Sequence, residues 1–326
     1  MDYDINKDGV TQTLLATYKQ CRTQAAKWLA GWEKPGFSEP LTFGNATHAV
    51  LEDLYNHYRV NKPPKITGLR GKKRVEPIVE EVAGLGKVWL AKWLKHERAN
   101  LSMDPKHAQY LEYIEAVLPH VLPHYVRMWG IDDFYGGRTW LELESKFAVD
   151  FHGIPLRGLR DGVYSKKGLM LLENKTKGQI DQHTLSDTLS FDFQNLFYIT
   201  ATNLDVARHI NGVLYNIIRR PQLRLKKNEQ YAELLVRIGE DIAARPDHYF
   251  VRYPLTYNKT RQKLFVKQLG YAIDEFHEWL CGNLKTFPNE FACVGRYTCQ
   301  YLQACAQNSN TGYTKRQVLF PELEGR

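Results

Sequence analysis

One predicted β-hairpin carries three residues suited to metal and phosphate chemistry, and it constrains the fold of this chain more than any other feature. Eleven residues separate Asp161 from Glu173-Asn174-Lys175 in the segment GLRDGVYSKKGLMLLENKTKG. Apolar runs at 158–164 and 169–172 flank Ser165-Lys166-Lys167-Gly168, which has the composition of a turn. We therefore predict two antiparallel strands on which Asp161 and Glu173 converge.

The spacing on the second strand suits hydrolysis of a phosphodiester. Successive side chains of a strand point to opposite faces, so Glu173 and Lys175 share one face while Asn174 faces the other. A divalent ion held by Asp161 and Glu173 polarises a phosphate and lowers the pKa of a bound water, and the Lys175 ammonium stabilises that water or the developing charge. The alternative is a surface hairpin with a Glu–Lys salt bridge.

Two predicted helices present further polar pairs. Residues 43–54 have apolar side chains at 50, 51 and 54, which indicates an amphipathic helix with His48 and Glu52 on one face. A second helix begins near residue 191 and places Gln194 and Tyr198 on one side. Each pair also has an ordinary explanation: a lone helical histidine is usually a core or surface residue, and a Gln–Tyr pair usually packs at the edge of a core.

These groups occur in one order: Gly44-x3-His48, Gly158-x2-Asp161, Glu173-x-Lys175 and Gln194-x3-Tyr198. In this order and at these separations they resemble the RecB-like branch of the PD-(D/E)xK nuclease superfamily over residues 21–305. The similarity is greatest to stand-alone bacteriophage exonucleases and to RecB-like CRISPR adaptation nucleases. Most relatives have Asp where Glu173 stands, and the superfamily name allows either acid.

The resemblance implies a role for each matched residue. The metal ligands would be His48, Asp161, Glu173 and the backbone carbonyl of Asn174. Lys175 would be the catalytic lysine, and Gln194 and Tyr198 would form a motif beside the active site that touches DNA or braces the lysine. The expected ion is Mg²⁺ or Mn²⁺, and a histidine ligand beside carboxylates favours Mn²⁺.

The cysteines form a second candidate metal site. Cys21 is isolated near the N-terminus, whereas Cys293, Cys299 and Cys305 cluster in FACVGRYTCQYLQAC. In a reduced cytosolic chain such a cluster indicates metal binding more than disulfides. In iron–sulfur nucleases of the family, one upstream and three C-terminal cysteines hold a [4Fe-4S] cluster, so the resemblance implies that role for these four thiols.

One position departs from that iron–sulfur pattern. Arg296 stands where the family usually has a cysteine, and the third thiol lies at Cys293 instead. A structural Zn²⁺ site and ordinary thiols are therefore alternatives to the cluster. Cys281, within the apolar segment FHEWLCGNL, is expected to be a small buried hydrophobic residue.

Composition limits the setting in which the chain acts. A length of 326 residues with 43% apolar content is enough for a full core. We find no run long enough to span a membrane and no signal-peptide profile at the start, so we expect a cytoplasmic protein, in a bacterial host if phage-encoded. The formal charge of +8 favours a polyanionic partner such as DNA.

Two basic segments are candidates for DNA binding. Residues 59–74, RVNKPPKITGLRGKKR, hold seven Lys or Arg and no acid, with prolines and glycines that indicate a mobile loop. Its candidate phosphate contacts are Arg70, Lys72, Lys73 and Arg74. A second run at 219–227 begins with Arg219 and Arg220 and is predicted to line a DNA path. The alternative for each is a solvated surface.

The order of elements predicts an α/β fold with a mixed central β-sheet flanked by helices, a restriction-endonuclease-like core. Expected helices cover 11–33, 44–60, 77–100, 105–129, 184–204, 228–243 and 259–284, and expected strands cover 138–150, 155–164, 169–176, 210–218 and 248–254. We expect the metal site at one edge of the sheet, roofed by the N-terminal helices.

We expect one compact nuclease domain over 1–326. Its parts would be a mainly helical segment 1–135 with His48, an α/β nuclease core 136–285 and a cysteine-cluster segment 286–326.

The predicted function is a metal-dependent DNA exonuclease that acts on DNA ends or single strands in phage recombination, replication or repair. A CRISPR-adaptation-type end-trimming nuclease shares every motif, and either enzyme would have a recombination or CRISPR-adaptation protein as a partner. A DNA-binding scaffold is a further alternative, against which the intact Asp161, Glu173 and Lys175 argue. A redox-signalling metal protein would leave the series from His48 to Tyr198 unexplained.

Overall fold

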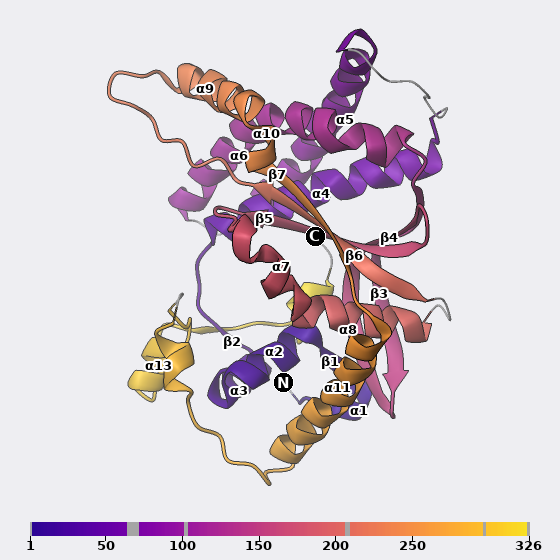
Figure 1. Ribbon diagram of the computed structural model, residues 1–326. Helices are drawn as coiled ribbons and strands as arrows, with labels where there is room; N and C mark the ends of the chain where they lie inside the picture. Colours follow the sequence, from indigo (N-terminus) through magenta and orange to yellow (C-terminus); the bar gives the residue numbers. More distant parts are fainter. Residues whose placement is uncertain (1, 64–71, 101–103, 206–208, 296–297, 325–326) are drawn as a thin grey trace.

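A mixed β-sheet runs through the centre of the molecule between two layers of helices (Figure 1). The computed structural model describes residues 2–63, 72–100, 104–205, 209–295 and 298–324. Among these residues the sheet has six strands: β1 (Val10–Thr11), β3 (Thr139–Phe151), β4 (Ile154–Ser165), β5 (Leu169–Lys177), β6 (Ile210–Arg219) and β7 (Phe250–Thr256). The predicted fold class is therefore confirmed.

The strand order places the predicted hairpin inside the sheet. Along one path the strands follow β1-β4-β5-β6-β7, and β3 pairs with the other edge of β4. Strand β4 is antiparallel to β3 and β5 and parallel to β1, while β5 and β6 are parallel and β7 is antiparallel to β6. The predicted hairpin is confirmed, because Ser165 pairs with Leu169 at its closed end.

One helical layer covers the face of the sheet toward which Leu172 and Leu214 point. It consists of α4 (Glu39–Val60), α5 (Lys72–Ala99), α6 (Pro105–Tyr125), the π-helix η1 (Val126–Tyr135), α9 (Tyr231–Ala244) and the short α10 (Pro246–Tyr249). Apolar residues at helical spacing bury one side of α4, among them Phe43, Val50 and Leu54. Helix α5 begins five residues before the predicted start at Pro77.

The second helical layer covers the opposite face. It consists of α1 (Ile5–Asp8), α2 (Gln12–Gln20), α3 (Arg22–Leu29), α7 (Gln182–Ser190), α8 (Phe193–Asp205) and α11 (Lys259–Leu280). The predicted helix 11–33 is broken because Cys21 is extended, with φ −163°. The predicted helix 184–204 is broken near Asp192, whose side chain accepts the backbone N–H of Asn195 at 2.7 Å.

The N-terminal helices therefore do not form a single roof over the site. Helices α2 and α3 pack with α8 and α11 below the sheet, whereas α4 to α6 lie above it (Figure 1). The reason is the short strand β1, which pairs with β4 at Leu156 and Arg157 and leads the chain into the lower layer.

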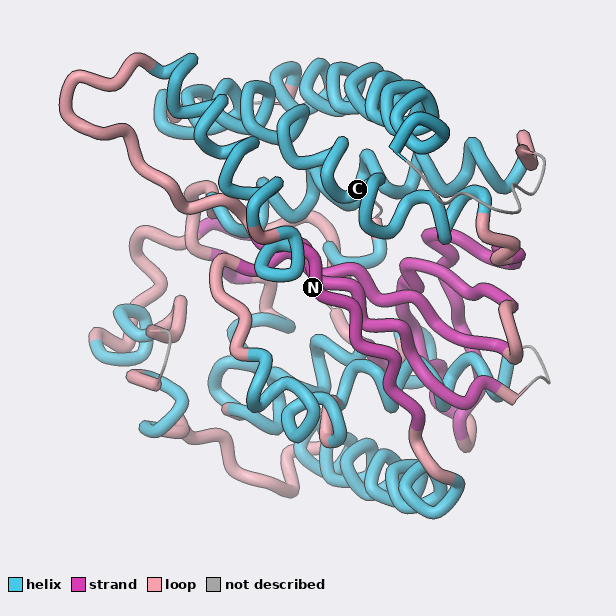
Figure 2. The backbone as a smooth tube through the Cα atoms, turned by 45° about the horizontal axis from the view of Figure 1, so that its top comes forward, coloured by secondary structure: helices cyan, strands magenta, loops and turns pink. Residues whose placement is uncertain are grey.

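The C-terminal segment returns to the N-terminal helices. It holds α12 (Glu290–Cys293), α13 (Leu302–Ala306), β8 (Thr314–Lys315) and the 3₁₀-helix η2 (Pro321–Leu323). Strand β8 pairs antiparallel with β2 (Trp32–Glu33), and the Arg316 guanidinium donates to the Trp28 carbonyl at 2.7 Å. Figure 2 shows the sheet between its helical layers and this looped segment at one side of the molecule. Within the described ranges, no helix has both the length and the apolar character needed to cross a membrane.

Candidate metal centre and cysteine cluster

The predicted catalytic residues lie where β4 and β5 separate, a point here called the fork. The two strands pair from Ser165↔Leu169 to Gly162↔Leu172, and Asp161 and Glu173 follow directly. Farther along, the same edge of β4 pairs with β1 instead. The expectation of a site at the edge of the sheet is therefore wrong, because β1 and β3 flank β4 while β6 and β7 extend the sheet beyond β5.

Asp161 is held from both sides of the fork. Its Oδ2 atom accepts the backbone N–H of Asn174 at 2.7 Å and lies 3.7 Å from Nδ1 of His48, which α4 places over the fork. Both side chains are buried. The backbone donor leaves the Asn174 side chain on the far face of the strand, as the strand periodicity predicted.

Glu144 on β3 is a candidate ligand that our sequence analysis did not identify. Ligand atoms of His48, Glu144 and Asp161 all lie within 4.8 Å of one another. Glu144 lies opposite Asp161, between the pairs Leu143↔Gly162 and Ser145↔Arg160, and its φ is 40°. A left-handed backbone at a glutamate in a strand stores strain of the kind that gathers at functional sites. The only sequence signal was Glu142-x-Glu144 on a predicted strand, which does not reveal its partner strand.

Glu173, Lys175 and Gln194 form a triangle on the face toward α8. The Lys175 ammonium contacts Oε1 of Glu173 and donates to Oε1 of Gln194 at 3.1 Å. Gln194 in turn donates through Nε2 to Glu173 at 2.8 Å. Burial lowers the pKa of Lys175, but the charges of Glu173 and Asp161 outweigh this effect and raise it, so the lysine stays charged.

Tyr198 lies one turn beyond Gln194 on α8 and closes the apolar side of the site. Its ring packs edge-on against Phe147 at 5.7 Å between centroids, and burial raises the pKa of its hydroxyl. Only glycine fits at position 158, because a Cβ atom there would lie 2.4 Å from Phe147 and 3.0 Å from Tyr198. The glycine of the Gly158-x2-Asp161 motif thus allows β4 to approach α8.

The structure describes the basic candidates to different extents. Arg70 lies outside the described residues, and only the backbone is described for Lys72, Lys73 and Arg74, which begin α5. The Arg219 guanidinium donates to the backbone carbonyls of His248, Gly178 and Ile180, and thereby fastens the loop that follows β5.

Arg220 lines a polar groove near the end of β5. Its backbone N–H donates to the carbonyl of Lys177 at 2.9 Å, and its guanidinium donates to the hydroxyl of Tyr110 at 2.9 Å and to Glu39 at 3.3 Å. The groove has a volume of about 970 Å³ and is also lined by Phe37, Lys106, Tyr113, Arg224 and Tyr231.

The four clustered cysteines lie together although their positions in the sequence are far apart. The Cys21 sulfur accepts the backbone N–H of Asn289 at 3.3 Å, and the Cys299 N–H donates to the Cys293 carbonyl at 3.0 Å. Burial raises the pKa of Cys293, and nearby Cys299 and Cys21 raise it further. Burial also raises the pKa of Cys305, again with contributions from the other three thiols.

Cys281 is separate from this group. The expectation that it is buried is wrong: it ends α11 as the C-cap residue, and its side chain is exposed. The helix ends at Leu280, four residues before the predicted end at residue 284, and Gly282 takes a left-handed backbone with φ 83° two residues later.

The comparison with known families agrees with this geometry. Residues 10–306 match the profile of the PD-(D/E)XK nuclease superfamily. The match spans the fork, α4, α8 and the clustered cysteines. No curated protein sequence matches the chain significantly. Members of this superfamily are nucleases that use divalent metal ions to hydrolyse phosphodiesters, and the carboxylate and imidazole groups at the fork are suitable ligands for such ions. The chain belongs to the PD-(D/E)XK nuclease superfamily.

Proposed function

We propose that this protein is a metal-dependent DNA exonuclease of the RecB-like branch, acting in phage recombination, replication or repair. The observation that carries the proposal is the meeting of His48, Glu144 and Asp161 within 4.8 Å, at the fork that also leads to Glu173 and Lys175. Three separate elements supply the first three residues. A salt-bridged surface hairpin does not account for this convergence.

The donor set suits a hard divalent ion with some preference for Mn²⁺, since an imidazole stands beside carboxylates. His48, Glu144, Asp161 and Glu173 would hold it, together with the backbone carbonyl of Asn174. When bound, such an ion supplies Lewis-acid polarisation of the scissile phosphate and lowers the pKa of a coordinated water.

The residues of the chain supply the remaining parts of the reaction. The Lys175 ammonium lies beside the carboxylates and stabilises negative charge that develops on the phosphate. Gln194 restrains both Lys175 and Glu173 through its amide, so that neither side chain has to find its position during the reaction. Asp161 keeps its orientation through the N–H of Asn174.

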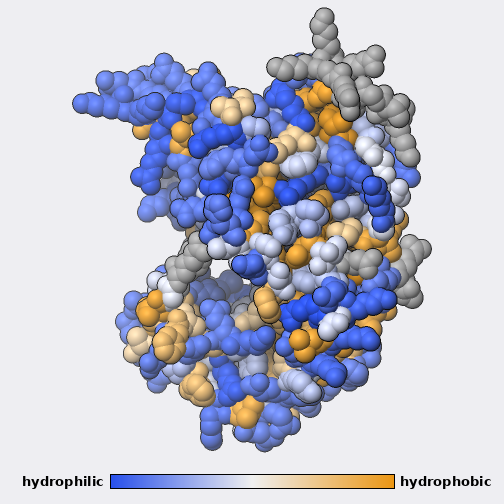
Figure 3. Space-filling model, viewed as in Figure 1, coloured by the Kyte–Doolittle hydropathy of each residue, from blue (hydrophilic) through white to orange (hydrophobic). Residues whose placement is uncertain are grey.

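Burial of the carboxylates supports action on ends or single strands. The exposed fractions of Asp161 and Glu173 are 4% and 3%, with α4 on one side of the fork and α8 on the other. A single strand can thread to such a site more readily than an uninterrupted duplex, whose width keeps its phosphates at the surface. Figure 3 shows the surface hollowed between the part with the sheet and α7 and the lobe of the cysteine segment.

Basic and aromatic side chains suggest how the strand is held. The groove with Arg220, Arg224 and Lys106 begins beside the end of β5 and contains Tyr231, whose exposed ring can stack on an unpaired base. Arg70, Lys72, Lys73 and Arg74 would add further phosphate contacts.

We also propose that Cys21, Cys293, Cys299 and Cys305 hold a [4Fe-4S] cluster. The set has the four thiolates that such a cluster takes. A structural Zn²⁺ bound by the same four thiols is the alternative, and metal analysis separates the two.

Digestion of labelled DNA tests the nuclease proposal. Linear single- and double-stranded DNA, labelled at either end, and covalently closed circular DNA of the same sequence are incubated with Mg²⁺ or Mn²⁺. We expect linear DNA to be degraded from an end and circles to persist. Cleavage of circles as fast as linear DNA would replace the exonuclease with an endonuclease, and no cleavage with either ion would end the proposal.

A further inference from the structure

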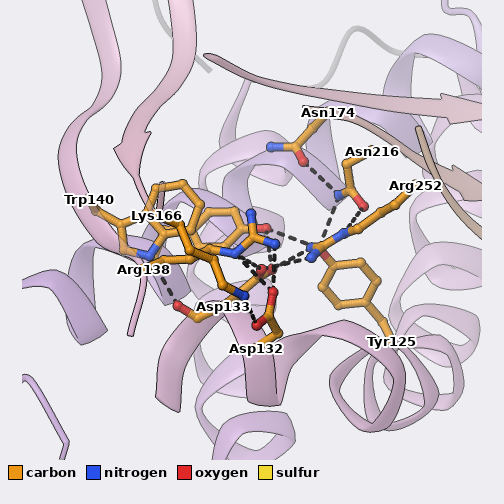
Figure 4. Close-up of polar contacts among 10 residues, drawn as sticks. Tyr125, Asp132, Asp133, Arg138, Trp140, Lys166, Asn174, Asn216 and Arg252 are labelled. Carbon is orange, nitrogen blue, oxygen red and sulfur yellow. Dashed lines mark hydrogen bonds and ion pairs between the residues drawn. The ribbon is translucent and has the colours of Figure 1, made fainter. Parts of the chain in front are cut away.

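A row of buried polar side chains crosses three strands on the face of the sheet opposite Glu173 and Lys175 (Figure 4). Asn174, Asn216 and Arg252 lie in register on β5, β6 and β7. Asn216 donates through Nδ2 to Oδ1 of Asn174 at 2.8 Å, and Arg252 donates through Nε to Oδ1 of Asn216 at 2.9 Å. The row therefore starts at Asn174, whose backbone N–H donates to Asp161.

The other end of the row is the carboxylate of Asp133 on the π-helix η1. Arg252 donates through Nη1 to Oδ1 of Asp133 at 2.8 Å and contacts Oδ2 through Nη2. The side chains of Arg252 and Asp133 are only 4% and 0% exposed. Tyr125 of α6 joins them, because its hydroxyl accepts from both Arg252 and Asn216.

Asp133 also contacts α4, the helix that carries His48. The hydroxyl of Tyr55 donates to Oδ2 of Asp133 at 3.2 Å. Tyr55 follows His48 by seven residues on α4, which is two helical turns, so both side chains lie on one side of that helix. One carboxylate thus connects α4 with the strand that carries Glu173 and Lys175.

The network extends to the turn of the catalytic hairpin. Arg138 lies 3.3 Å from Asp133 and 2.6 Å from Asp132, and Asp132 also contacts Lys166 in the β4–β5 turn (Figure 4). Helix α4, strand β5 and the β4–β5 turn are therefore all joined to the same pair of adjacent aspartates.

Stability alone is a weak reason for such a pair. Removing two charges from water is costly, and apolar residues of similar volume often stabilise a fold as well as a buried ion pair does. Hydrogen bonds from a buried charge do, however, fix the relative positions of the elements they join. Outer-shell partners of this kind orient metal ligands, and their loss typically lowers metal affinity or activity 10–100-fold.

We propose that the Arg252–Asp133 pair positions the metal ligands. It holds α4, which carries His48, at a fixed distance from β5, whose Asn174 N–H orients Asp161. At this distance His48 and Asp161 share one ion. The inference rests on the proposed metal-dependent nuclease and deepens it. Arg252 and Asp133 are positioning residues, since they act through Tyr55, Asn216 and Asn174 and do not themselves line the fork.

The double variant Asp133→Leu/Arg252→Met tests this role, because it removes both charges and leaves neither one unpaired. We expect its urea unfolding to stay near that of the wild type. Mn²⁺ binding, measured by calorimetry as the heat that Asp161→Asn abolishes, should weaken by about tenfold or more. The kcat should fall and be partly restored by excess Mn²⁺, while KM for DNA stays unchanged.

A matched control removes another Arg–carboxylate pair. Arg237 and Glu229 form a hydrogen-bonded pair at α9, with Nε 2.7 Å from Oε1. Glu229→Leu/Arg237→Met should leave the Mn²⁺ affinity unchanged. If the Asp133/Arg252 variant does not fold, Asn216→Ser replaces it, since that change interrupts the row between Arg252 and Asn174 and leaves the ion pair in place.

The outcomes separate the two proposals. A folded variant that binds Mn²⁺ and cleaves DNA like the wild type would overturn the positioning role. If the wild type binds Mn²⁺ at the fork but does not cut DNA, the exonuclease proposal fails, and the calorimetric comparison still decides whether Arg252 and Asp133 position the ligands.

Discussion

The backbone N–H of Asn174 donates to Oδ2 of Asp161 at 2.7 Å, across the fork between β4 and β5. This charge-assisted bond replaces the strand pairing that would otherwise continue beyond Gly162 and Leu172. It aims the carboxylate of one strand by means of the backbone of the other. The backbone carbonyl of Asn174 and the side chains of Glu173 and Lys175 are consequently held at fixed positions relative to Asp161.

Lys175→Met should abolish most cleavage and leave DNA affinity nearly unchanged, because the ammonium acts on charge that develops during the reaction. The expected loss in kcat is about 100- to 1,000-fold. Lys177→Met is the matched control, since Lys177 lies two residues farther on β5 and its ammonium lies 5.5 Å from the centre of the Tyr215 ring. Single-turnover digestion of labelled DNA measures both variants, and equal losses would remove the special role of Lys175.

Glu144→Gln should raise the Mn²⁺ concentration needed for half-maximal cleavage by about tenfold or more, because it removes a charged ligand without changing the shape of the side chain. Glu142→Gln provides the control, since Glu142 is on the same strand but pairs with Arg160 at 3.0 Å. Metal titrations of cleavage compare the two. A requirement that does not change in Glu144→Gln would show that Glu144 is not a ligand.

Cys21→Ser should bleach the protein and lower its melting temperature. Purified without oxygen, the wild type should be brown and absorb broadly at about 400 nm, as thiolate-bound iron does. Metal bonds that form only in the folded chain contribute directly to folding free energy. The exposed Cys281 provides the control, and Cys281→Ser should change neither property. Zinc without iron in metal analysis would identify a structural zinc site instead.

Neutral substitution of Arg70, Lys72, Lys73 and Arg74 should weaken DNA binding and flatten its dependence on salt. Each lost phosphate contact reduces the slope of log K against log salt by about 0.7–0.9. Cleavage at saturating DNA should change little. The comparison variant replaces exposed lysines on α11, namely Lys259, Lys263 and Lys267. Fluorescence anisotropy over a range of salt concentrations gives both slopes, and equal slopes would indicate that residues 70–74 are a solvated surface.

The stability of the fold should decrease as the pH falls through about 6.5, the ordinary pKa of histidine. Burial lowers the pKa of His120 and His124 on α6, and the charges of Lys87 and Arg127 lower it further. The unfolded chain then binds more protons than the folded one below about pH 6.5, so acid favours unfolding.

Urea unfolding between pH 7.5 and 5.5 measures this effect. His120→Gln/His124→Gln should show a smaller decrease in the free energy of unfolding than the wild type. The exposed His209→Gln should behave like the wild type. A double variant with the full wild-type decrease would assign the pH dependence to other groups.

Much of the fold followed from local pattern. Apolar runs on either side of Ser165-Lys166-Lys167-Gly168 predicted the hairpin, and the two-residue period of a strand placed Glu173 and Lys175 on one face, where Gln194 contacts both. The break at Cys21 was missed, because residues on either side of it have a continuous helical pattern and the contact of its sulfur with the Asn289 N–H joins residues 268 positions apart.

Local residues specified most of the long helices and strands, the faces of their side chains and the order of the nuclease motifs, because hydrogen bonds between near neighbours and the periods of helix and strand depend on local residues. Other features depend on contacts between residues that are far apart in the sequence. Glu144 became a candidate ligand only through its register opposite Asp161, and the site lies inside the sheet because β1 joins β4. Arg252 and Asp133 are 119 residues apart, so their pairing depends on packing of the whole upper layer against the sheet.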